Sequence, residues 1–221
     1  MARPLRIEFP YAIYHVTSRG DRREPIFGDD FDRCRLLDVF EEAFQKFDAG
    51  ALAWCLMPNH YHLLVQTRQA NLSRVMRHIN GVYTQRFNRR HETTGHLFQG
   101  RFHAVLIEAE SHLLEVGRYV ELNPVRGELA PGPAEWAWSS YRAHAGLAPA
   151  PAWLDVDAVR GYMLERPATC EADRREAADR YAALVASAVA AEPWYRNVRH
   201  GQYLGSEDFI AQAMRRQDRT R

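Results

Sequence analysis

The sequence predicts an α+β fold of the ferredoxin-like type, an antiparallel βαββαβ sheet with an added helix and a mostly helical C-terminal extension. Three observations predict it. The chain of 221 residues is 46% apolar and 26% charged, which is enough to bury a core. Segments with strand and helix periodicity alternate in the order that this fold requires. After Gly127 the composition changes, and Pro-, Trp- and Ala-rich segments begin.

Each element has a local signal. The strands are runs rich in aromatic and β-branched residues, and the helices repeat apolar residues at helical spacing after a capping Asp or Asn. A Pro-Asn pair between two short apolar runs predicts a hairpin, and an Asn-Pro pair predicts the end of the last helix. The predicted elements are strand 11–18, a helix from Asp29 or Asp30 to near Gly50, strands 51–57 and 61–67, a helix capped by Asn71 and running through Arg90, strand 102–108, and a helix from Ser111 to about Leu122.

We expect residues 1–145 to form the main domain and residues 146–221 to form a helical extension of unknown role. A cluster of Trp136, Trp138 and Tyr141 is expected to pin this extension onto the main domain. An Ala-Pro linker separates the two parts, and 12 arginines balance 12 acids over residues 131–221. The predicted elements of the extension are helices over residues 155–164 and 171–191 and a last helix after Gly205-Ser206-Glu207.

Composition excludes several classes of protein. Lys plus Arg total 29 and Asp plus Glu total 28, so a polycation of the histone type is excluded. The three cysteines are far apart and fit a reducing cytoplasm. We find no secretory signal, no membrane span, and no motif of nucleotide-binding enzymes or serine hydrolases. We therefore expect a cytoplasmic protein without a membrane partner.

Positive charge is concentrated locally. Between Arg68 and His103 there are seven arginines and one acid, Glu92, and the first 23 residues add five arginines against two acids. Arginines along a helix often form only a solvated face, but this density favours nucleic-acid binding. The DNA-binding candidates are Arg19, Arg74, Arg77, Arg86, Arg89, Arg90 and Arg101.

Two pairs of residues are candidates for chemistry. His60 and His62 alternate along a predicted strand, so both imidazoles project from one face and suit one divalent metal. Solvated hairpin histidines, or a zinc site that includes Cys55, are the alternatives. Tyr119 and Asn123 lie one helical turn apart on one face, and a tyrosine hydroxyl can act as a covalent nucleophile.

Three motifs together resemble a known family. They are M-P-N-H-Y-H-L-L-V at residues 57–65, G-H-L-F-Q-G-R-F at 95–102 and R-Y-V-E-L-N-P-V-R at 118–126. In this order they resemble the single-tyrosine HUH transposases, and most of all the branch of REP-associated tyrosine transposases. The resemblance covers roughly residues 5–145, which would then be the catalytic domain.

The resemblance implies a role for each candidate residue. His60 and His62 would be the HUH pair, with Tyr61 where the family has a bulky apolar residue. Tyr119 would be the nucleophile, and Asn123 the third ligand of Mg²⁺ or Mn²⁺. The implied activity is cleavage and transfer of single-stranded DNA at REP-like hairpins through a 5′-phosphotyrosine. Monomer and homodimer are both compatible with it.

Rival readings remain at this stage. The same fold could serve as a catalytically idle regulator that binds hairpin DNA, or as a metal-dependent ribonuclease that does not need the tyrosine. Tyr119 is preferred over Tyr61, which should point to the opposite side of its strand, and over Tyr83, which has no amide one turn later. His15 is expected to be a structural histidine, with support of the metal-binding histidines from behind as the alternative. Candidates for base stacking are Phe98, Phe102, His96 and His103, although the two phenylalanines could equally pack in the core.

Overall fold

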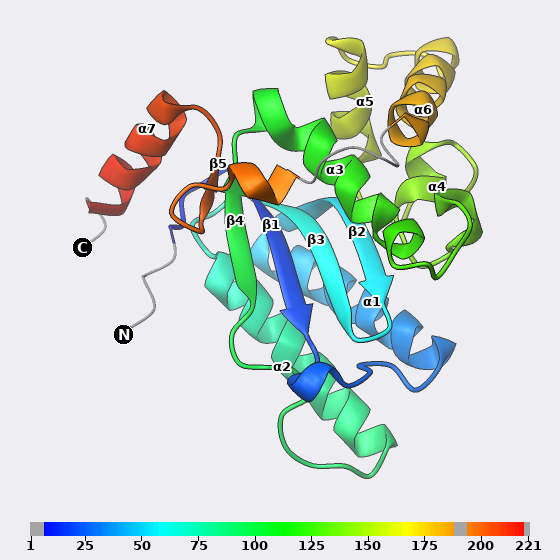
Figure 1. Cartoon of the computed structure of the whole chain (residues 1–221), viewed down its shortest axis with the longest axis vertical. Coiled ribbons are helices and arrows are strands. Elements are labelled where there is room, and N and C mark those ends of the chain that lie inside the picture. The colour runs from blue at the N-terminus through cyan, green and yellow to red at the C-terminus, as the bar shows by residue number, and fades with distance from the viewer. Residues whose placement is uncertain (1–6, 188–193, 219–221) are drawn as a thin grey trace.

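The computed structural model describes residues 7–187 and 194–218 and contains a five-stranded sheet of order β2-β3-β1-β4-β5. Figure 1 shows the sheet between a layer of two helices, α1 and α2, and a third helix, α3, on its other face. The elements are β1 (Ala12–Arg19), α1 (Asp30–Phe47), β2 (Ala49–Met57), β3 (His60–Thr67), α2 (Leu72–Arg90), β4 (His103–Ile107), α3 (Ala109–Arg126), α4 (Tyr141–His144), α5 (Val156–Leu164), α6 (Glu171–Ala186), β5 (Tyr203–Leu204) and α7 (Glu207–Asp218).

The order of these elements confirms the predicted α+β plan. β1 lies between β3 and β4 and is antiparallel to both, and β2 and β3 form the hairpin around Pro58 and Asn59. The side chain of Asp29 caps α1 by accepting a hydrogen bond of 3.2 Å from the Asp32 amide, as its sequence position suggested. The turn of the hairpin and the start of α1 are therefore both fixed by local chemistry that is visible in the sequence.

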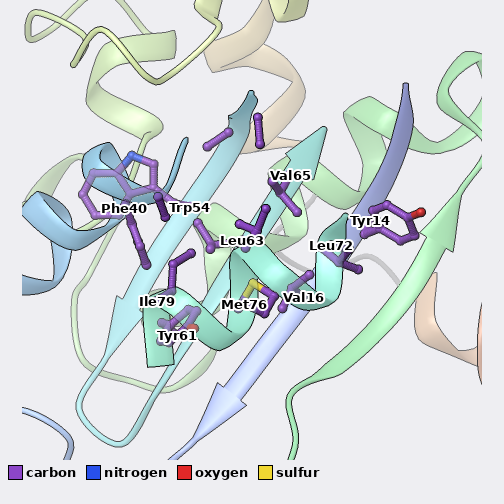
Figure 2. Close-up of a cluster of buried hydrophobic side chains, with 14 of the residues drawn as sticks. Tyr14, Val16, Phe40, Trp54, Tyr61, Leu63, Val65, Leu72, Met76 and Ile79 are labelled. Atoms are coloured by element: carbon purple, nitrogen blue, oxygen red, sulfur yellow. The ribbon is translucent and has the colours of Figure 1, made fainter. Parts of the chain in front are cut away.

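The larger core fills the space between the sheet and α1 and α2. Alternate residues of β1 and β3 point into it, including Tyr14, Val16, Leu63 and Val65, and Phe40 of α1 meets them. Figure 2 shows this cluster, with the β3 and β1 side chains facing those of α2. The residues between them point to the opposite face, where α3 lies.

α3 extends four residues further than the sequence predicted, to Arg126, and passes through Pro124. Proline has no N–H, so the Val120 carbonyl loses its usual helical donor. The side chain of Asn123 supplies a replacement, because its Nδ2 donates to the carbonyls of Val120 (3.1 Å) and Tyr119 (2.9 Å). The predicted stop at Asn123-Pro124 is wrong because the asparagine side chain replaces the missing donor.

The tryptophan-rich segment that leads into the extension is bonded to β2. Trp136 Nε1 donates to the Leu56 carbonyl (3.1 Å), and the Leu56 amide donates to the Trp138 carbonyl (2.8 Å). Tyr141 begins α4 and is buried. The expected helices follow, except that residues 188–191 of the second lie outside the described residues.

One part of the extension was not predicted. β5 pairs with β4 in parallel, and a 3₁₀ turn at Trp194–Asn197 packs against the α3 face of the sheet. In Figure 1 this turn, in orange, lies beside α3 near the start of β1. The sheet is therefore mixed rather than wholly antiparallel, and the extension reaches the face that carries the polar strand residues. None of the described helices is sufficiently long and apolar to cross a membrane.

Candidate functional site

Polar side chains replace apolar ones at one end of the sheet face that α3 covers. The register places Thr17 of β1 opposite both His62 of β3 and His103 of β4. His15 lies two residues before Thr17 and His60 two residues before His62, so all share this face. The predicted common face of His60 and His62 is thus a consequence of strand alternation.

His62 is held by the two β1 side chains behind it. Its Nδ1 lies 2.9 Å from His15 Nε2 and 3.2 Å from Thr17 Oγ1. The rings of His15 and His62 stack, with centroids 5.1 Å apart. His62 Nε2 is buried and has no hydrogen-bond partner within residues 7–187 and 194–218. A buried imidazole nitrogen without a protein partner is the atom that a metal ion would use.

His60 completes the pair. Its ring centroid lies 5.0 Å from that of His62, and its Nδ1 lies 2.7 Å from Asn59 Oδ1, which orients the ring. Burial lowers the pKa of His60 to about 4, with a further contribution from Arg19. Burial also lowers the pKa of His62, and lowers that of His15 to about 3. All three imidazoles are therefore neutral at pH 7, which is the form that binds metals.

The ring of Tyr119 lies beside these histidines. Its centroid is 6.2 Å from that of His62 and 6.4 Å from that of His15, in both cases edge to face. The 3₁₀ turn of the extension encloses it from another side, with Trp194 at 5.7 Å and Tyr195 at 5.9 Å. Sequence reasoning missed these two aromatic residues, because they lie far along the chain in a segment without periodicity.

Charge around Tyr119 acts in two directions. Burial and Tyr195 raise the pKa of its hydroxyl, whereas Arg126 and Arg19 lower it. The Arg126 guanidinium lies 4.8 Å from the ring centroid of Tyr119. The hydroxyl is therefore protonated at neutral pH, and the two arginines favour the anion that must form when it attacks an electrophile.

A cavity of about 630 Å³ opens at this point, and Tyr119 and His62 both line it. Arg19 and Arg101 also line it and are both exposed, and Gln99 and His103 lie beside them. The cavity thus combines an aromatic hydroxyl, a neutral imidazole and two cations. Such a site can bind a phosphodiester and attack it.

The placement of Asn123 beside the histidines has less support than that of Tyr119. Its amide NH₂ group faces its own helix, as described above, and neither Asn123 nor His60 is among the residues that line the cavity. Asn123 Oδ1 forms no hydrogen bond with the part of the chain that the structure describes, so this oxygen is the atom that could bind a metal. Its assignment as the third ligand stays a prediction.

Other donors fit a metal less well. The described residues contain no group of three His, Cys, Asp or Glu side chains arranged around one point. Cys55 is opposite His62 on the neighbouring strand, but burial raises the pKa of its thiol, which keeps it protonated. A zinc site that includes Cys55 is therefore poorly supported, and Mg²⁺ or Mn²⁺ as the bound metal stays a prediction.

The two rival tyrosines lie on the other face of the sheet. Tyr61 is fully buried against Phe40, and its hydroxyl donates to Asn80 Oδ1 (2.6 Å). The hydroxyl of Tyr83 donates to the Ile26 carbonyl (2.6 Å). The expectation that Tyr61 points away from the histidines is confirmed.

The candidate arginines fall into two groups. Arg86 pairs with Glu42 at 2.8 Å, and Arg90 pairs with the acids that start α1, so their charges are compensated. Arg74 lies over the ring of Phe47. The remaining candidates are exposed and form no ion pair among the described residues: Arg19, Arg77, Arg89 and Arg101.

The candidates for base stacking also divide. Phe98 is buried between Tyr61 and Tyr83, so it belongs to the core. Phe102 is half-buried, and His96 and His103 are exposed. Base stacking stays a prediction for the exposed side chains and has no support for Phe98.

A buried polar network fixes α3 behind the site. Glu121 is completely buried and accepts hydrogen bonds from Ser140 Oγ (2.5 Å), His144 Nδ1 (2.7 Å) and the Tyr181 hydroxyl (2.9 Å). These donors come from the start of α4, from α4 and from α6. The helix that carries Tyr119 is therefore tied to the extension by its own carboxylate.

Comparisons with known proteins identify a family and a shared fold. The sequence model of the family described as IS200-like transposases matches residues 9–123, slightly more than half of the chain. No curated protein matches. Among solved structures, a REP-associated tyrosine transposase bound to a REP hairpin is similar, with 18% identity over 70% of this chain and 94% of that chain and a TM-score of 0.57. A proposed transposase from Deinococcus radiodurans R1 has 16% identity over 54% of this chain and 96% of that chain, with a TM-score of 0.39.

The first of these structures shows a shared fold, and the family model matches more than half of the chain, which shows the family. The resemblance that the three sequence motifs indicated is thereby confirmed, and the chain belongs to the IS200-like transposase family.

Proposed function

We propose that this protein cleaves and rejoins single-stranded DNA, and that Tyr119 is the nucleophile. One observation carries the proposal. The Tyr119 ring lies edge to face against His62, whose buried Nε2 has no partner in the described protein, and both line a cavity that also holds Arg19 and Arg101. A nucleophile, a metal-binding atom and two phosphate-binding cations thus surround one space.

In the proposed reaction the Tyr119 oxygen attacks the scissile phosphorus and loses its proton to water. The bond from phosphorus to the 3′ oxygen breaks, and that oxygen takes a proton from water and leaves as a 3′ hydroxyl. The DNA remains attached through a 5′-phosphotyrosine, and attack by another 3′ hydroxyl reverses the step. Arg126 and Arg19 favour the tyrosinate by their charge, while Trp194 and Tyr195 limit the orientations of the ring.

We assign His60, His62 and Asn123 as the ligands of Mg²⁺ or Mn²⁺. A bound divalent ion would supply Lewis acidity that withdraws charge from the phosphate. His15 and Thr17 hold His62 in one ring orientation, and Asn59 does the same for His60, so the imidazoles need little rearrangement to bind.

The proposed substrate is a DNA hairpin of the REP type with single-stranded flanks. The shared fold with the transposase that was solved on a REP hairpin supports this choice. We place the reaction in the cytoplasm, where the free thiols of Cys34, Cys55 and Cys170 would persist. The hairpin-binding regulator remains the second candidate, and the distinction between them is covalent chemistry.

The test is a denaturing gel of the protein mixed with labelled single-stranded DNA from repeats that flank its own gene. The wild type should give a covalent protein–DNA band in Mg²⁺ or Mn²⁺, and excess EDTA should abolish it. Tyr119→Phe removes one oxygen, so the protein should fold and bind the hairpin without forming the band. Tyr61→Phe is the matched control and should keep the band.

Each outcome separates the candidates. A regulator would give no band even with the wild type. If the protein were a hydrolytic nuclease, the Tyr119→Phe variant would still cut DNA. Full cleavage in EDTA would contradict the metal assignment, and an adduct formed by Tyr119→Phe would contradict the nucleophile.

A further inference from the structure

A second hollow lies beside the candidate active site, between α2 and the segment 95–102 that leads into β4. It has a volume of about 760 Å³. Figure 1 shows the connection after α2 returning toward the start of β4. The groove and the cavity beside Tyr119 have Arg101 as a common lining residue.

The base of the groove is apolar and its edges are polar. Met76 and Phe98 are buried and form its base, whereas Arg77, Gln85 and His96 are exposed at its edges. Flat apolar surfaces receive the faces of unstacked bases, and exposed amides and cations meet base edges and phosphates. A duplex keeps its base faces stacked inside, so it has no group that would occupy an apolar base of this kind.

The charge of the groove is positive. Arg77 and Arg101 form no ion pair among the described residues. The single acid in the lining, Glu8, accepts hydrogen bonds from the backbone N–H of Ser73 (2.8 Å) and from its hydroxyl, in the first turn of α2. Its charge is therefore partly offset by the positive end of the helix. Arg86, further along α2, is by contrast compensated by Glu42.

Gly81 provides an independent observation. It lies within α2, is exposed and lines the groove, and a Cβ added there would meet no atom within 4 Å. A glycine inside a helix costs about 1 kcal/mol relative to alanine, and the packing of this chain does not require it. Gly100 also lines the groove, with φ +62° and open space around its Cα. Bare backbone on a groove lining allows a ligand to approach closely.

We propose that this groove binds a single-stranded segment of the DNA substrate adjoining the scissile phosphate, with phosphates on Arg77 and Arg101 and the strand passing over Gly81. The inference rests on the proposed function, since it names where that substrate continues outside the catalytic cavity. It assigns α2 and the segment 95–102 to selection of the flank rather than to the chemistry.

The test uses one substitution that should strengthen the fold and weaken binding. Gly81→Ala removes a helix-destabilising residue and should raise Tm by about 2 °C. Its methyl group should lower the affinity for hairpin DNA with single-stranded flanks about tenfold. Gly161→Ala on α5 is the matched control, since its Cβ would meet only the Arg166 carbonyl at 3.9 Å. It should raise Tm equally and leave affinity unchanged.

Binding is measured by fluorescence anisotropy in EDTA, with hairpins that carry a flank of six nucleotides on the 5′ side, on the 3′ side or on neither. Gly81→Ala should weaken binding only where a flank is present. Arg77→Gln should reduce the slope of log affinity against log salt by about 0.7 on the flanked hairpin, the value for one single-strand phosphate. Arg86→Gln should leave the slope unchanged, because the charge of Arg86 is already paired with Glu42.

The outcomes are decisive in both directions. Wild-type affinity in Gly81→Ala, equal losses on flanked and unflanked hairpins, or no gain in affinity from a flank in the wild type would each overturn the groove assignment. Since no cleavage occurs in EDTA, the groove is tested independently of the chemistry. Absence of the covalent band together with flank-dependent losses would refute the proposed function and leave the groove in place.

Discussion

Replacing Glu121 by leucine should destabilise the protein and also slow formation of the covalent adduct. The carboxylate is fully buried and binds three donors, Ser140, His144 and Tyr181, which belong to other elements. It lies two residues after Tyr119, so the network fixes the rotation of α3 over the sheet. Loss of the carboxylate therefore affects the nucleophile as well as the core.

The magnitude follows from the groups that would be left unpaired. Loss of the carboxylate leaves buried donors without an acceptor, and each such donor costs about 1–3 kcal/mol. We therefore expect Glu121→Leu to lower the free energy of unfolding by about 5 kcal/mol, which lowers Tm by about 10–20 °C in a protein of this size. Glu121→Gln keeps the shape and one acceptor oxygen and should lose about 2 kcal/mol.

The assay combines thermal unfolding with single-turnover adduct formation at saturating DNA, well below both melting temperatures. A displacement of about 1 Å can cost about 100-fold in rate, so we expect at least a tenfold slower adduct with nearly unchanged hairpin affinity. Leu36→Ala is the control, because it removes about 2–5 kcal/mol from the core on the other face of the sheet. Equal rates in Glu121→Leu and the wild type, or an equal loss in Leu36→Ala, would refute the reasoning.

Three further predictions concern the surroundings of the site. Trp194→Ala should lower the free energy of unfolding by about 3–5 kcal/mol and should slow formation of the covalent adduct. A normal rate of adduct formation would show that the 3₁₀ turn contributes only to packing. His15→Phe keeps a ring behind His62 but removes its hydrogen bond, so Mn²⁺ affinity measured by calorimetry should fall about 10- to 100-fold, and an unchanged affinity would contradict that role. Burial acts to raise the pKa of Asp32, but hydrogen bonds led by that from Arg90 outweigh it and hold the pKa below 3.8. The stability that Asp32 contributes is therefore present above about pH 4 and lost below it, and Asp32→Asn should flatten this acid loss in urea unfolding, whereas a parallel acid curve would contradict it.

The order of elements could be predicted because local signals and tertiary packing agree. Strand alternation placed His60 and His62 on one face and Tyr61 on the other, and helical periodicity placed Tyr119 one turn before Asn123. The length of α3 could not be predicted from the Asn-Pro pair alone, because the side-chain replacement of the lost backbone donor depends on its rotamer. The two-residue strand β5 is too short for any alternation to be detected.

The site was predictable only where its residues form motifs. His15, Thr17, Trp194 and Tyr195 belong to no motif, and they meet the candidate residues through strand register and chain reversal. Charge density along the sequence indicated a basic face but not which arginines are compensated. That distinction depends on acids of α1, such as Glu42, which are distant in sequence from their partners on α2.

The late position of β5 has a consequence for biosynthesis. Tyr203 pairs with Leu106, and Trp194 reaches His15, so the last segments of the chain complete an arrangement whose other members emerge from the ribosome much earlier. Until then the outer edge of β4 is open, and open strand edges pair readily with other chains. A message cut short after α3 would therefore yield a product prone to association before it could act on DNA. Translation past β5 is therefore needed before this edge of the sheet is closed.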